Sequence, residues 1–180
     1  MSKIKVDSIV PRGGVPSGAT GGGIIQIVEK NDASQSSTTS TSWTNSGVSS
    51  LNLSITPSST SSKILMMVSL QLEMNGAQTG SIIFARNPAG SPVYFANTEV
   101  ASGLNPGNDS DGVSKLFLSQ GYGSLNGQTT SHYGIDSPAT TSSVTYGFLW
   151  GVNNGTAYYN RGIDSSYTGS SSIILMEVSG

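Results

Sequence analysis

The stretch "KILMMVSLQLEMNG", residues 63–76, constrains the fold more than any other part of the chain. Its apolar side chains recur at every second position, which fits the two-residue period of a β-strand and not the 3.6-residue period of a helix. Serine, glutamine and Glu73 occupy the opposite face, but Leu65 and Met67 interrupt that polarity. The sequence therefore predicts a long strand whose first half is covered on both faces. Its continuous apolar face consists of Ile64, Met66, Val68, Leu70, Leu72 and Met74.

Shorter segments with strand-like patterns follow one another along the chain, separated by turn signals. The turn "PAGSP" is expected to close a hairpin. Asn154-Gly155 predicts a second hairpin with a type I′ turn, which needs positive φ at both central residues. Residues 120–142 are polar and glycine-rich and are expected to form loops, whereas residues 31–47 could supply a polar edge strand. The other expected strands lie within residues 24–28, 48–55, 81–87, 92–97, 113–119, 143–152, 157–160 and 172–180.

This pattern of eight to ten short strands, without a convincing helix, is typical of an antiparallel β-sandwich or jelly roll. The last strand carries "IILMEV" and is expected to be paired in the middle of a sheet. We expect residues 23–180 to form one β-sandwich head domain. Residues 1–22 would then form a separate N-terminal segment and linker.

The composition indicates a neutral surface rich in hydroxyl groups. Serine and threonine together account for 34 + 16 = 50 of the 180 residues, and only 10% are charged. A surface with so little charge offers little defence against self-association, so it suits a subunit of an assembly. Eight basic against ten acidic residues give no basic cluster for nucleic acid. The absence of cysteine excludes disulfides and thiolate metal sites, and we expect no cofactor.

The N-terminal residues 1–22 combine a short apolar segment with the linker "PRGGVPSGATGGG". The start "MSKIKVDSIV" is too short and too charged for a signal peptide, so we expect folding in a cytoplasm. No apolar run approaches the length needed to cross a bilayer, and membrane insertion is not expected. The segment is predicted to dock on a partner as an added strand or plug. Its docking residues would be Ile4, Val6, Ile9, Val10 and Arg12.

Several segments resemble those of phage virion proteins, in particular tail-fibre and structural proteins of cyanophages and other marine phages. The resemblance rests on "SLNLSITPSSTSSKILMMVSL", on "PATTSSVTY", on the ending "SSIILMEV" and on the opening "MSKIKVDSIVPRGG". It covers essentially the whole chain, although its motifs carry little chemistry. The resemblance implies a non-enzymatic, homotrimeric protein whose N-terminus docks on a phage tail or capsid protein while the β-domain projects outward.

Catalytic and metal-binding motifs are weak. "GATGGG" lacks the Gly-Lys-Ser/Thr ending of a phosphate loop and is interpreted as a linker. Asp109 and Asp111 could form a loose calcium site, but an Asx-rich turn is the simpler interpretation. His132 lacks a nucleophile-elbow motif nearby and is expected in a loop. The tetrapeptide "GIDS" occurs twice and is interpreted as two similar turns capped by Asp136 and Asp164. The alternative is that these two residues form a carboxylate pair for glycoside hydrolysis.

Tyrosines in polar, glycine-rich segments are better candidates for binding. Tyrosine rings among neutral amides and hydroxyls offer the stacking and hydrogen bonding that a glycan needs. The alternative is that most of them pack the domain or an interface between subunits. These candidate contacts with a host-surface glycan are Tyr122, Tyr133, Tyr158, Tyr159 and Tyr167.

The sequence therefore favours a trimeric tail fibre of a virion, attached by its N-terminus and adhesive through its head. A capsid decoration or head-fibre protein would have the same architecture. A third possibility is a glycan-degrading tailspike enzyme, which would need a groove lined by acids and aromatic residues.

Overall fold

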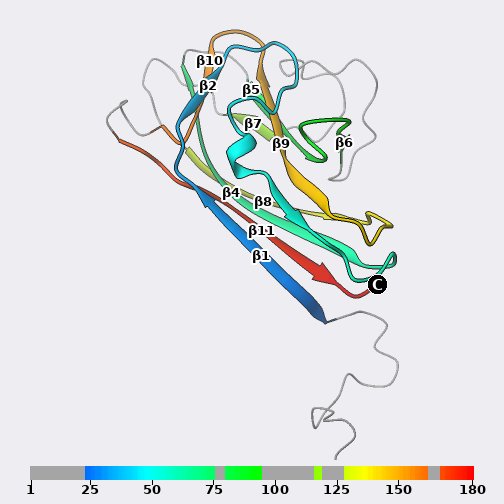
Figure 1. Cartoon of the computed structure of the whole chain (residues 1–180). Coiled ribbons are helices and arrows are strands. Elements are labelled where there is room, and N and C mark those ends of the chain that lie inside the picture. The colour runs from blue at the N-terminus through cyan, green and yellow to red at the C-terminus, as the bar shows by residue number, and fades with distance from the viewer. Residues whose placement is uncertain (1–22, 76–79, 95–115, 119–127, 162–166) are drawn as a thin grey trace, which may run out of the picture.

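The computed structural model describes residues 23–75, 80–94, 116–118, 128–161 and 167–180 (Figure 1). Within these ranges the regular structure consists of β-strands and one turn of 3₁₀ helix, η1 (Ser49–Leu51), so the predicted all-β fold is confirmed. The strands are β1 (Ile24–Asp32), β2 (Ser36–Thr38), β3 (Leu53–Ile55), β4 (Lys63–Asn75), β5 (Gly80–Arg86), β6 (Val93–Tyr94), β7 (Leu116–Leu118), β8 (Gln128–Asp136), β9 (Val144–Val152), β10 (Thr156–Tyr159) and β11 (Ser171–Val178).

The strands form two antiparallel sheets. Sheet A has the order β1-β11-β4-β10-β2, with β8 also paired to β4. Sheet B has the order β3-β9-β5-β6, with β7 also paired to β5. Figure 1 shows β1, β11, β4 and β8 running side by side, with the strands of sheet B lying over them.

At three places in the sheets, two strands lie one after the other along the same side of a neighbouring strand or pair of strands. Counting each such pair as one strand reveals the topology. β10 pairs with β4 at 72–75 and β11 pairs with β4 at 63–69, both on the side of β4 away from β8. β1 and β2 continue this arrangement along β11 and β10, and β6 and β7 both lie along β5. With β1 and β2, β6 and β7, and β10 and β11 each counted as one, the described fold has eight strands. Numbered along the chain, they have the order 1-8-3-6 in sheet A and 2-7-4-5 in sheet B. This is the strand order of a jelly roll, a double-sheet fold of eight strands.

The core lies between the sheets and contains the predicted apolar faces. All six alternate residues of β4 from Ile64 to Met74 are buried, and so are the five alternate residues of β9 from Val144 to Val152. Tyr159 from β10 and Leu175 from β11 complete this core. Alternation therefore identified the inward face of the long strands correctly, because only one face of each meets the opposite sheet.

Several local predictions are confirmed. β11 lies between β1 and β4, so the last strand is central as expected. β5 and β6 pair antiparallel across the "PAGSP" turn. Residues 36–38 form the polar edge strand β2. In the segment 48–55, Leu51 ends η1 and only Leu53–Ile55 form β3, so the predicted strand is shorter than expected.

The prediction that residues 120–142 form only loops is wrong for β8. This nine-residue strand pairs with β4 from Leu72 to Ile64 and has His132 in its middle. Its inward residues are polar or small, so they lack the alternation that identifies a strand. Backbone hydrogen bonds to β4 hold it instead.

The hairpin predicted at Asn154-Gly155 is also wrong. β9 belongs to sheet B and β10 to sheet A, so the connection crosses from one sheet to the other. Gly155 has a φ of 81°, but Asn154 is not among the residues with positive φ, as a type I′ turn requires. The chain does turn at Gly155, but the packing of the two sheets places β9 and β10 in different sheets.

In the described part of the chain, the first half of β4 is not covered on both faces. Met67 remains 42% exposed and Leu65 is half-buried, although their neighbours on the inner face are buried. No other strand of the described fold packs over this outer face of sheet A.

Candidate binding surfaces

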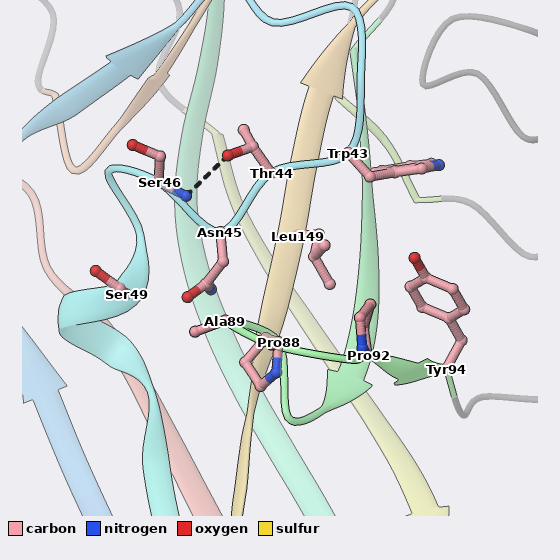
Figure 2. A pocket seen from close by; sticks show the side chains of 11 residues that line it. Trp43, Thr44, Asn45, Ser46, Ser49, Pro88, Ala89, Pro92, Tyr94 and Leu149 are labelled. Atoms are coloured by element: carbon pink, nitrogen blue, oxygen red, sulfur yellow. Dashed lines mark hydrogen bonds between the residues drawn. The ribbon is translucent and has the colours of Figure 1, made fainter.

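A pocket of about 480 Å³ lies on the outer face of sheet B (Figure 2). Leu149 of β9 forms its floor, and two connections form its walls: residues 43–49 and the β5–β6 turn. Ile83, Ala85 and Leu149 make a small buried cluster there, against which Trp43 and Tyr94 pack. In Figure 2, Trp43 and Tyr94 stand on one side of Leu149 and Asn45 on the other.

The wall formed by residues 43–49 is fixed by hydrogen bonds to β9. The backbone of Thr44 pairs with that of Trp150 in both directions, at 3.1 and 2.9 Å. Asn45 donates to the Phe148 carbonyl oxygen at 2.8 Å and exchanges two amide hydrogen bonds with Asn52, at 3.1 and 2.8 Å. The polar side of the pocket is therefore held in place before any ligand arrives.

The chemistry of the pocket is aromatic and neutral. Its lining contains no charged side chain and combines two aromatic rings with serine, threonine and asparagine groups. The indole Nε1 of Trp43 is buried and has no hydrogen-bond partner. Rings for stacking beside neutral donors and acceptors suit an uncharged polar ligand such as a sugar.

The tyrosines predicted as glycan contacts do not gather in this pocket. Tyr133 and Tyr167 are highly exposed, and the Arg161 guanidinium covers the Tyr158 ring at 4.1 Å. Tyr159 is fully buried between Phe148 and Trp150, so it has the packing role that was the alternative. Tyr122 lies outside the described residues.

Sequence reasoning missed Trp43 and Tyr94. Trp43 stands alone in a hydroxyl-rich run, and such an isolated aromatic was the available signal for it. Tyr94 lies within a predicted strand and gave no signal, because its position beside Trp43 depends on the β5–β6 hairpin.

Asp136 has hydrogen-bond partners on strands β5 and β9. It accepts hydrogen bonds from Tyr146 at 2.8 Å and from Arg86 at 3.0 Å, the latter an ion pair whose side chains are only 18% and 10% exposed. It ends strand β8, so the prediction of an Asx-capped turn is wrong for this residue. Asp164 lies outside the described residues.

His132 projects toward the core from β8, so its expected loop position is wrong. Its ring lies 6.2 Å from that of Phe84, and its Nε2 contacts the Thr130 hydroxyl at 2.5 Å. Burial lowers the pKa of His132. This environment favours a neutral imidazole that packs at the edge of the sandwich.

Glu73 was predicted on the polar face of β4, but it is only 3% exposed. Neither carboxylate oxygen has a hydrogen-bond partner, and the Nε of Arg161 is likewise buried without one. Burial raises the pKa of Glu73, and the nearby Arg161 charge opposes this only in part.

Glu177 is fully buried and, in contrast, richly hydrogen-bonded. It accepts from the Ser58 backbone at 2.7 Å, from the hydroxyls of Ser58 and Ser62 at 2.6 Å, and from Gln26 at 2.5 Å. Burial opposes its ionisation, but these hydrogen bonds outweigh it and lower the pKa of Glu177 to about 2. This acid joins β11, β1 and the 56–62 turn.

A second surface is the outer face of sheet A. The strand registers align Ile27, Met176, Leu65 and Ile135 in one row across β1, β11, β4 and β8. The next row is Glu29, Ile174, Met67 and Tyr133. These two rows define the surface that we call the sheet A apolar face.

The predicted anchor residues Ile4, Val6, Ile9, Val10 and Arg12 lie outside the described residues, as do Asp109 and Asp111. Across the described ranges, no three His, Asp or Glu side chains gather as metal ligands would. Nor does this part of the chain contain a helix long and apolar enough to cross a membrane. No protein family model and no curated protein sequence matches the chain.

Proposed function

We propose that this chain is a non-enzymatic virion structural protein, a trimeric tail fibre attached by its N-terminus, whose β-sandwich head adheres to host-surface glycans. The observation that carries the adhesive role is the pocket lined by Trp43 and Tyr94, which is aromatic, uncharged in its described lining and preformed. The jelly-roll topology supports the proposal, because this fold is common to viral capsid and lectin domains. The sequence resemblance to phage fibre proteins supplies the virion context.

Adhesion is tested by binding of the full chain to cells of the phage host. Trp43→Ala and Tyr94→Ala should each weaken binding about tenfold, since loss of one stacking ring costs about 1 kcal/mol per site and several sites act together. Val93→Ala, next to Tyr94 but outside the pocket, is the control. If the pocket variants stay folded and bind like the wild type, the adhesive role is refuted.

A capsid decoration or head-fibre protein is the second candidate, since jelly rolls also occur in capsids. Immunogold labelling of particles of the phage that encodes the chain separates the two. Label at the tail supports the fibre, label on the capsid supports decoration, and particles without label refute both. The tailspike alternative predicts release of sugars from host polysaccharide, which Asp136→Asn should abolish.

A further inference from the structure

The sheet A apolar face holds half of the large hydrophobic side chains that are exposed in the described part of the chain. There are eight such side chains, and Ile27, Met67, Tyr133 and Ile135 lie in the face, with exposures between 42% and 75%. Two more, Ile24 and Ile25, adjoin the face at the start of β1. Such clustering marks an interaction surface, since scattered single residues would be the ordinary case.

The two edges of sheet A differ in their protection. β1 carries Glu29, Lys30 and Asp32 along its edge, and charged side chains discourage edge-to-edge association. Among the described strands β8 is also at an edge, yet "QTTSHYGI" carries neither a carboxylate nor a lysine before Asp136. A nine-residue edge without this protection is expected where an assembly covers it.

The outer surface of sheet A that contains this face is large enough for a specific contact. Four strands spaced about 4.8 Å apart and nine residues long at about 3.4 Å each span roughly 19 by 31 Å. This whole outer surface, about 590 Å² before side-chain relief and with the two apolar rows as one part of it, is close to the roughly 600 Å² per partner of the smaller specific interfaces. Next to the apolar rows lies a row of hydroxyls, Ser172, Ser69 and Ser131, which suits the polar rim of such an interface.

The charges of the face favour further copies of this chain as its occupant. Glu29 ends one of the two rows and the exposed Lys63 lies beside the other, so neighbouring copies can set opposite charges against each other. A strongly charged partner would find no net charge of opposite sign on this face.

We propose that copies of this chain associate through the sheet A apolar face. The inference rests on the trimeric part of the proposed function and adds the surface that forms the trimer. It explains why Leu65 and Met67 are apolar on a face that no strand of the described fold covers. A neighbouring copy supplies the missing cover.

The mass of the full chain in solution tests this proposal. By light scattering at micromolar concentration, the wild type should be trimeric, and Met67→Glu and Tyr133→Glu should shift it toward monomer. Val93→Glu and Tyr167→Glu add the same charge at exposed positions outside the face and should remain trimeric. A monomeric wild type refutes both this inference and the trimer. Trimeric face variants refute this inference alone.

Cysteine protection provides a test that does not need the interface to be broken. The chain has no cysteine, so Tyr133→Cys and Val93→Cys each introduce one thiol. In the trimer, maleimide should modify the thiol at position 133 at least tenfold more slowly than in urea-unfolded protein, while position 93 shows little protection. Equal reactivity of both thiols in the trimer overturns the proposal.

Discussion

At the scale of single residues, two buried glutamates show how the same side chain has opposite effects on the fold. Glu177 accepts four hydrogen bonds, whereas the carboxylate of Glu73 has no hydrogen-bond partner. The pKa of Glu177 is lowered and that of Glu73 is raised. Their contributions to stability therefore depend on pH with opposite signs.

Glu177→Gln should reduce the free energy of unfolding at pH 7 by about 2 kcal/mol, the size of one hydrogen bond to a charged group. Because the folded-state pKa of Glu177 is about 2, against an ordinary value of 4.5, its stabilisation is complete above about pH 4.5 and is lost as pH falls toward 2. Urea unfolding at pH 7 and pH 3 measures this. An equal loss at both pH values would contradict the hydrogen-bonding account.

Glu73→Gln should stabilise the fold by about 1 kcal/mol at pH 7, because a neutral amide is cheaper to bury than an unpaired carboxylate. A raised folded-state pKa means that the ionised group destabilises the fold above that pKa, so the wild type should gain stability as pH falls through it. The advantage of the variant should therefore shrink in acid. A destabilised variant would show that Arg161 compensates the carboxylate.

At the scale of elements, strand β9 is fitted closely to the segment that forms one wall of the pocket. A Cβ added at Gly147 would overlap Asn52 Oδ1, and the Asn52 side chain is held by Asn45. The same amide pair orients the polar side of the pocket. Packing of a strand and geometry of the site are therefore coupled at this glycine.

Gly147→Ala should destabilise the protein by about 2 kcal/mol, as overpacking of a fixed neighbour does. It should also weaken host-cell binding, because Asn45 must move with Asn52. Thermal unfolding and the cell-binding assay measure the two effects. Gly23→Ala, which lies outside the pocket and whose added Cβ meets nothing within 4 Å, should leave both unchanged. Normal stability and binding of Gly147→Ala would show that Asn52 is free to relax.

At the scale of the whole molecule, the two ends of the described domain lie together. Ile24 at the start of β1 pairs with Val178 at the end of β11 (Figure 1). An attachment through residues 1–22 would therefore hold the domain by this end of sheet A.

Deletion of residues 2–12 should leave a folded, soluble oligomer that no longer enters virions, because none of the residues that define the sheet A apolar face belongs to the deleted segment. Light scattering reports the oligomer, and immunoblots of purified particles report incorporation. Particles that still contain the truncated protein would refute the predicted anchor.

The sequence by itself determined the all-β class, the inward faces of β4 and β9 and the central place of the last strand. Each of these follows from local alternation, which records how one face of a strand meets the core. Tertiary structure alone decided the rest. β8 exists because β4 offers it backbone partners, Asn154-Gly155 crosses between sheets, and Trp43 meets Tyr94 only after residues far apart in sequence are brought together. Such long-range contacts leave no periodic trace in the chain, so sequence patterns do not reveal them.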